Sequence, residues 1–235
     1  MQAVILAGGL GTRLHQIVDD VPKPMASVAG RPFLARLMDH LAAASFNSLV
    51  LSVGHKRETI MATFGSRYGR LTLAYAVEHT PLGTGGAMKN AWPLVYEDPV
   101  FVLNGDTFVE IDFRAMRQAH EAAGTRLTIA LIRVDNAARY GRVVVEDGRL
   151  IAFEAKARPG PGLINAGVYL VGKAVLTDPA LPTCFSFEHD LLATRLDALR
   201  PRAFLTEGRF IDIGVPEDYV RAQQLFAAAD LRLGS

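Results

Sequence analysis

Apolar runs of strand length alternate with amphipathic stretches through the first half of the chain. We predict strands over these runs, at residues 3–7, 49–53, 71–77, 100–103 and 127–133. The stretches between them carry apolar side chains at helical spacing, which predicts helices at residues 32–44, 58–64, 85–92 and 112–123. Asp112 is the expected N-cap of the last of these helices. Strands that alternate with helices are typical of β-α-β units around a parallel sheet.

The pattern changes after residue 133. Two apolar runs flank Asp147-Gly148, which predicts a hairpin over residues 143–153 with a two-residue turn. We predict further strands at 163–171 and 210–213, and helices that begin at Ser186 and at Pro216.

These elements predict one α/β domain over residues 1–235, built on a Rossmann-like, doubly wound mixed sheet. No linker rich in proline, glycine or serine divides the chain. We therefore expect two lobes of one domain, at about 1–133 and 134–235, with the second carrying the smaller added strands.

Composition excludes several classes of partner. The 235 residues carry a formal net charge of +1, which gives no general surface for nucleic acid or membrane. No stretch approaches the ~20 apolar residues of a membrane span, and the apolar start of the chain lacks the basic leader of a signal peptide. The single cysteine, Cys184, cannot form an internal disulfide, so a cytoplasmic location is expected. The oligomeric state is left open between a monomer and a homodimer.

A glycine-rich loop follows the first strand. Such loops commonly bind phosphate, because glycine lets backbone N–H groups approach an anion. The loop contains Gly8, Gly9 and Gly11, followed by Thr12 and Arg13. It lacks the third glycine of a dinucleotide-binding loop and the Gly-Lys pair of a P-loop.

The run from Leu6 to Leu14, followed by Pro22-Lys23-Pro24-Met25, resembles the sugar-1-phosphate nucleotidyltransferase family. The resemblance implies that the first loop binds the nucleotide, through Leu6, Ala7, Gly8, Gly9, Gly11, Thr12 and Arg13. It also implies catalytic roles for two cations: Arg13 would hold the leaving pyrophosphate and Lys23 the α-phosphate. Physical chemistry agrees, because fixed cations offset the charge of a triphosphate during attack by another phosphate. The lobes at 1–133 and 134–235 would then hold nucleotide and sugar.

Two aspartates are candidate Mg²⁺ ligands. Asp106 follows the apolar strand at 100–103, where ligands bind in open α/β sheets, and the resemblance implies that it is both catalytic and a metal ligand. Asp212 lies between isoleucines, and a buried carboxylate needs a partner or a metal. A simple turn at Asp106 and a capping role for Asp212 near Gly214 are the alternatives.

A second loop resembles the segment that reads the base, and it contains Glu78, Pro81, Gly83 and Thr84. A carboxylate only accepts hydrogen bonds, which suits the adjacent N1–H and N2–H₂ donors of guanine. A solvated loop glutamate is the alternative, and some uridylyl members also carry glutamate in this loop.

On the sugar side, the resemblance implies contacts from Asn104, Gly141, Lys156 and Asn165. The family usually places a glutamate before the lysine, but position 155 carries alanine. Whether any carboxylate contacts the sugar is therefore open.

The expected reaction is attack by a sugar 1-phosphate on the α-phosphate of a nucleoside triphosphate, with Mg²⁺ as cofactor.

Within the family, the short chain and the uninterrupted runs at 21–26 and 81–87 resemble the branch that makes GDP-heptose for surface polysaccharides. GTP and D-glycero-α-D-manno-heptose 1-phosphate are the expected substrates. UTP or dTTP with mannose, glucose or amino-sugar 1-phosphates is the alternative. A regulatory homologue without activity and a glycosyltransferase are further alternatives, although the usual D-x-D motif of the latter is absent at 104–106.

Overall fold

The computed structural model describes residues 1–9, 21–154, 159–214 and 216–233. Its centre is a ten-stranded sheet with the order β10-β11-β13-β9-β12-β7-β1-β4-β6-β5. Four neighbouring strands are parallel: β7 (Val100–Asn104), β1 (Gln2–Leu6), β4 (Ser48–Val53) and β6 (Leu71–Val77). The chain order reverses between β1 and β7, which makes this pair the switch point of a doubly wound sheet.

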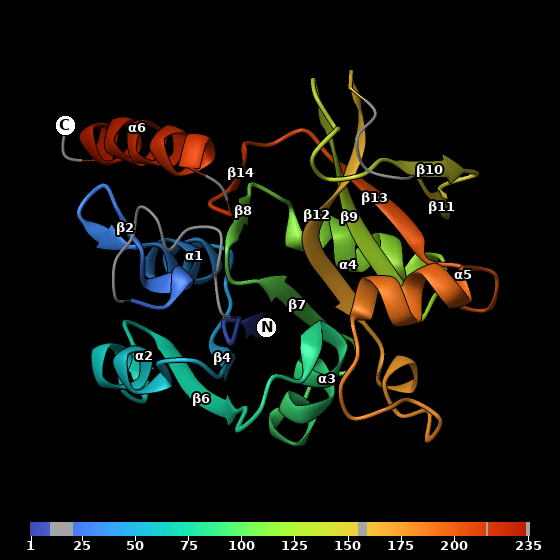
Figure 1. The fold of residues 1–235 in the computed structure, drawn as a ribbon, viewed down its shortest axis with the longest axis horizontal. Helices are drawn as coiled ribbons and strands as arrows, with labels where there is room; N and C mark the ends of the chain where they lie inside the picture. The colour runs from blue at the N-terminus through green and yellow to red at the C-terminus, as the bar shows by residue number, and fades with distance from the viewer. Residues whose placement is uncertain (10–20, 155–158, 215, 234–235) are drawn as a thin grey trace.

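Strands from the second half of the chain extend this sheet (Figure 1). β12 (Gly162–Val171) inserts between β7 and β9 (Leu127–Val134) and runs antiparallel to both. Beyond β9 lie β13 (Arg202–Thr206), β11 (Arg149–Phe153) and β10 (Val143–Glu146), and the short β5 (Arg67–Tyr68) forms the opposite edge. Residues on both sides of position 133 therefore share one sheet, and the assignment of separate nucleotide and sugar lobes stays a prediction.

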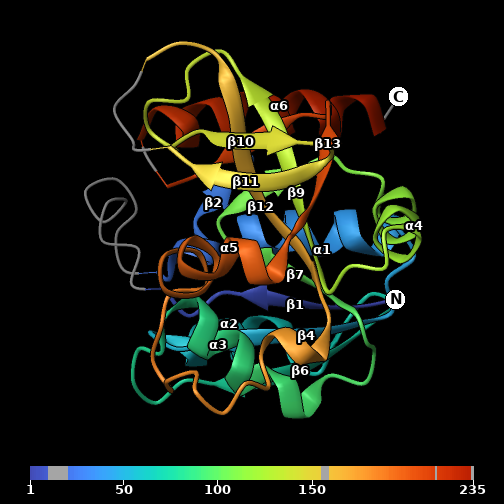
Figure 2. The same cartoon turned by 90° about the vertical axis from the view of Figure 1, so that its right-hand side faces the viewer.

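Helices cover both faces of the sheet (Figures 1 and 2). On one face, α1 (Phe33–Ala43), α2 (Arg57–Phe64) and α4 (Phe113–Ala122) contribute to one apolar cluster with the sheet. On the other face, α3 (Gly83–Ala91) and the π-helix η4 (Phe187–Leu192), which continues into α5 (Ala193–Leu199), contribute to a second cluster. Two buried layers of this kind hold the strand ends in fixed positions, which a site at the sheet edge requires.

Smaller elements complete the described chain. The last helix, α6 (Pro216–Leu233), packs Ala222 and Phe226 against the outer side of α1. Two small sheets pair β8 (Thr107–Val109) with β14 (Phe210–Asp212) and β2 (Ser27–Val28) with β3 (Arg31–Pro32). Three 3₁₀ helices are present at η1 (Lys23–Met25), η2 (Trp92–Leu94) and η3 (Lys173–Val175). Within the described residues, no helix is long and apolar enough to cross a membrane.

The predicted strands and helices are confirmed, with boundaries that move by at most two residues. The Asp112 carboxylate accepts a hydrogen bond from the Ala115 N–H at 2.9 Å, as an N-cap does. Asp147 and Gly148 have φ values of 47° and 69°, which a type I′ turn requires.

Other expectations differ from the structure. The segment after Ser186 begins as a π-helix before it becomes α-helical. β8 and β13 were not predicted, because their short sequences lack a clear apolar run. The only histidine on α4, His120, is buried there and contacts the Thr128 hydroxyl at 2.8 Å. Burial lowers the pKa of His120, which favours the neutral ring.

Candidate active site

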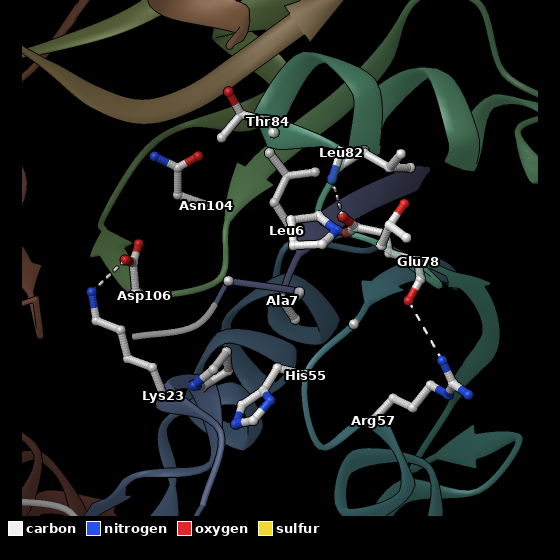
Figure 3. A pocket seen from close by; sticks show the side chains of 18 of the residues that line it. Leu6, Ala7, Lys23, His55, Arg57, Glu78, Leu82, Thr84, Asn104 and Asp106 are labelled. Atoms are coloured by element: carbon white, nitrogen blue, oxygen red, sulfur yellow. Dashed lines mark hydrogen bonds and ion pairs between the residues drawn. The ribbon is translucent and has the colours of Figure 1, made fainter. Parts of the chain in front are cut away.

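A cavity of about 590 Å³ opens at the carboxyl ends of β1, β4, β6 and β7, at the switch point of the sheet (Figure 3). It is lined by many of the residues that the sequence singled out: Leu6, Ala7, Gly8, Gly9, Lys23, Glu78, Pro81, Gly83, Thr84, Asn104 and Asp106. Its position follows from the fold, because parallel strands place their carboxyl ends at one edge. The volume lies in the range of small-molecule sites.

Four predicted residues lie outside the part of the chain that the structure describes: Gly11, Thr12, Arg13 and Lys156. Gly141, Asn165 and Asp212 are described but do not line the cavity. The sequence missed Gly54, His55 and Arg57, which line it from the end of β4 and the start of α2. The signal was available, because the strand preceding them was recognised and its carboxyl end had to lie beside that of β1.

Glu78 is held in a defined orientation at one end of the cavity. The side chain is buried, with 9% of the residue exposed. Its Oε1 accepts a hydrogen bond from the Ser52 hydroxyl at 3.0 Å, and its Oε2 accepts one from the Leu82 N–H at 3.3 Å. The alternative of a solvated loop glutamate therefore does not describe this residue. Each carboxylate oxygen keeps a further lone pair for a ligand.

Two glycines allow this packing. A Cβ atom at Gly8 would lie 2.4 Å from Glu78 Oε1, and one at Gly105 would lie 2.6 Å from the Leu6 carbonyl oxygen. Gly105 also donates its N–H to that carbonyl at 2.9 Å. The ends of β1, β6 and β7 can therefore approach one another only because these positions lack side chains.

Gly8→Ala is expected to raise the KM for the nucleotide about tenfold, because the new methyl group forces Glu78 away from Ser52. Steady-state kinetics with thermal unfolding as a fold check measures this effect. The matched variant is Gly9→Ala, where an added Cβ meets no atom of the described residues within 4 Å and a smaller loss is expected. Equal losses in the two variants would contradict the role given to the Gly8–Glu78 contact.

Lys23 and Asp106 line the other end of the cavity, and Asp212 lies next to them. Lys23 Nζ is 2.5 Å from Asp106 Oδ2, and Figure 3 shows the two side chains pointing toward each other. The backbone of Lys23 lies in η1, preceded by Pro22 and followed by the buried Pro24. Prolines on both sides restrict the backbone and help to fix the position of the ammonium group.

Asp212 joins this group through the pairing of β14 with β8. Asp212 is opposite Thr107 in that pair, and the Ile213 N–H donates to the Asp106 carbonyl at 3.0 Å. A Cβ at Gly214 would lie 2.7 Å from Asp212 Oδ1 and 3.0 Å from Lys23 Nζ, so both groups crowd around this glycine. Asp212 also accepts a hydrogen bond from the Gly214 N–H at 2.7 Å, which is the contact that the capping alternative predicted.

The pKa of the Asp212 carboxyl is raised above its ordinary value, first because the group is buried and then because the charge of Asp106 is near. The Lys23 ammonium acts in the opposite direction. A cation between two carboxylates that repel each other stabilises their charged forms.

The donor set fits Mg²⁺. Hard carboxylate oxygens are its usual protein ligands, and one or two of them suffice when phosphate oxygens and water complete the shell. No cluster of three or more histidine, cysteine, aspartate or glutamate side chains that could hold a metal ion occurs in the described parts of the chain.

The fold and this site define a class of protein. A model of the nucleotidyl transferase family matches residues 2–228, and the chain belongs to this family. The predicted family and the Rossmann-like fold class are thereby confirmed.

Similar proteins have more specific names. The chain is 41% identical to D-glycero-alpha-D-manno-heptose 1-phosphate guanylyltransferase of Aneurinibacillus thermoaerophilus, over 95% of this chain and 97% of that one. It is also 41% identical to the protein of the same name from Campylobacter jejuni subsp. jejuni serotype O:2, over 93% and 97%. The crystal structure of HddC from Yersinia pseudotuberculosis complexed with GMP-PN matches with a TM-score of 0.86 and 37% identity, over 96% of this chain and 99% of that chain.

Proposed function

We propose that this protein transfers GMP from GTP to D-glycero-α-D-manno-heptose 1-phosphate and releases pyrophosphate. One arrangement carries the proposal: the cavity has an acceptor carboxylate, Glu78, at one end and the Lys23–Asp106 pair at the other. The similarity to heptose 1-phosphate guanylyltransferases over nearly the whole chain supports the same substrates. Mg²⁺, held by Asp106 and Asp212, is the proposed cofactor.

In the proposed reaction, a phosphate oxygen of the sugar 1-phosphate attacks the α-phosphorus of GTP. A new P–O bond forms there, the bond from the α-phosphorus to the bridging oxygen breaks, and pyrophosphate leaves with the electron pair. The attacking phosphate is already ionised at neutral pH, so no general base is needed. Lys23 stabilises the charge that builds up on the α-phosphate. When bound, Mg²⁺ would neutralise phosphate charge as a Lewis acid.

Glu78 would select the base. Guanine presents N1–H and N2–H₂ as adjacent donors, and a carboxylate fixed by Ser52 and Leu82 can accept from them without reorganising. Uracil and thymine present one imide donor between two carbonyl groups, which face a carboxylate less favourably. The guanine assignment therefore rests on the position and the charge of this side chain.

We expect GTP to be the preferred nucleotide in a matrix of GTP, UTP, dTTP, CTP and ATP against heptose, mannose and glucose 1-phosphates. Mannose 1-phosphate should be a poorer but detectable substrate, because discrimination by one added carbon is worth only ~1–3 kcal/mol. Pyrophosphate release measures every combination. A tenfold preference for UTP or dTTP would refute the proposal that Glu78 selects guanine.

The same matrix addresses the other candidate functions. A glycosyltransferase would not release pyrophosphate from these pairs, and a regulatory homologue would bind nucleotide without turnover. The oligomeric state stays open between a monomer and a homodimer, and the cytoplasmic location stays a prediction.

A further inference from the structure

A second polar cluster lies beside the cavity, on β12 and the π-helix η4. Glu188 Oε1 accepts two hydrogen bonds, from the Tyr169 hydroxyl at 2.6 Å and from Asn165 Nδ2 at 2.7 Å. Asn165 Nδ2 also donates to the Tyr169 hydroxyl oxygen at 2.8 Å, and Asn165 Oδ1 accepts from the Gly167 N–H at 3.0 Å. The three side chains therefore form a closed triangle.

The triangle leaves Asn165 little capacity for a ligand. The amide has two N–H donors, and both are used, toward Tyr169 and Glu188. The side chain that the sequence assigned to the sugar is thus occupied in holding a carboxylate. Tyr169 is fully buried, and the pKa of its hydroxyl is raised, first by burial and then by the charge of Glu188, so it stays a hydrogen-bond donor at neutral pH.

Glu188 presents the opposite situation. Its Oε1 is held by two donors, whereas its Oε2 has no hydrogen-bond partner among the described residues. The residue is partly exposed. An acceptor that is fixed through one oxygen and open at the other is pre-organised for a hydroxyl donor.

Contacts on two sides connect this cluster to the cavity. The neighbouring Phe187 N–H donates to the Thr84 hydroxyl at 2.9 Å, and Thr84 lines the cavity. On β12, a Cβ at Gly167 would lie 2.9 Å from Asn104 Nδ2, and Asn104 also lines the cavity. Figure 3 shows Thr84 and Asn104 on the side of the cavity away from Arg57.

We propose that Glu188 recognises the sugar, with Oε2 accepting a hydrogen bond from a ring hydroxyl, and that Asn165 and Tyr169 are positioning residues for it. The inference rests on the proposed function and names the sugar-side acceptor that the alanine at position 155 left open. Charge adds a directional reason. A carboxylate repels the phosphate of the substrate and attracts its hydroxyls, so Glu188 turns the hydroxyl edge toward η4 and the phosphate toward Lys23.

Glu188→Gln is the decisive variant. The glutamine Oε1 can keep both bonds from Tyr169 and Asn165, while an NH₂ donor replaces the open acceptor. We expect about 10–100-fold weaker binding of mannose 1-phosphate, the range for loss of one charge-assisted hydrogen bond, with affinity for inorganic phosphate changed less than twofold. Isothermal titration calorimetry measures both ligands without turnover. Tyr169→Phe should shift binding in the same direction by less, and Glu146→Gln, at an exposed hairpin position, is the matched control.

Binding of deoxy analogues of mannose 1-phosphate distinguishes direct recognition of the sugar by Glu188 from a structural role of this residue. The wild-type protein should bind one analogue at least about tenfold more weakly than the parent sugar, and Glu188→Gln should bind that analogue and the parent alike. Three results would overturn the inference: unchanged binding in Glu188→Gln, equal weakening of inorganic phosphate and sugar phosphate, or retained discrimination among the analogues. Wild-type binding of mannose 1-phosphate no tighter than of inorganic phosphate would overturn it as well. Sugar binding through Glu188 without pyrophosphate release from any nucleotide would instead refute the proposed function and leave this inference standing.

Discussion

Asp106→Asn is expected to lower kcat at least about 100-fold, which corresponds to about 2.7 kcal/mol of transition-state stabilisation. A neutral amide is a poor ligand for a hard cation, and Asp106 lines the cavity beside Lys23. The Mg²⁺ concentration for half-maximal activity should rise in the variant. For the unchanged protein, EDTA should abolish activity and added Mg²⁺ should restore it.

The variant should remain folded. Its partner, Lys23, is partly exposed, and ion pairs of this kind contribute at most about 1 kcal/mol. Asp147→Asn provides the matched control, because the exposed turn residue undergoes the same chemical change away from the cavity. Full turnover in Asp106→Asn, with an unchanged Mg²⁺ requirement, would refute the metal assignment.

Lys23→Ala is expected to lower kcat by about 10²–10³ and to change the KM for GTP only a few-fold. The ammonium group acts where charge develops on the α-phosphate, so its loss affects the transition state more than the ground state. The two variants should differ in their metal dependence. Removing the cation that contacts Asp106 at 2.5 Å should leave the Mg²⁺ requirement unchanged or lower it.

Steady-state kinetics with GTP and Mg²⁺ varied separately distinguishes these roles. Lys173→Ala is the control, because that lysine is exposed at the start of η3. An effect of Lys23→Ala confined to KM would mean that Lys23 only anchors the bound nucleotide. A raised Mg²⁺ requirement would mean that it supports the metal site instead.

Local signals in the sequence were sufficient for most of the architecture. The core strands β1, β4 and β7 are apolar runs that bury side chains on both faces of the sheet, so each strand can be recognised from its own residues. The caps at Asp112 and Ser186 and the turn at Asp147-Gly148 depend on residues a few positions apart. Caps and turns of this kind depend only on residues close in sequence, so they can be predicted without the tertiary structure.

Strand pairing over long separations could not be predicted in the same way. β13 has an alternating and mostly partial burial pattern, and its neighbours β9 and β11 come from distant parts of the chain. The insertion of β12 between β7 and β9 likewise has no local signal. The positions of β12 and β13 depend on which apolar faces remain to be buried after the central strands have paired. They are therefore fixed only when the whole sheet assembles.

The sequence by itself determined the family and the candidate residues Lys23, Glu78 and Asp106, because each lies in a short motif that can be recognised from neighbouring residues. The tertiary structure decided how they are arranged. It placed Asp212 beside Asp106 through the pairing of β8 with β14 and fixed Glu78 through Ser52. It also brought Glu188 to Asn165 across two elements. Polar groups so far apart in sequence meet only after burial of the surrounding apolar faces has fixed the backbones that carry them.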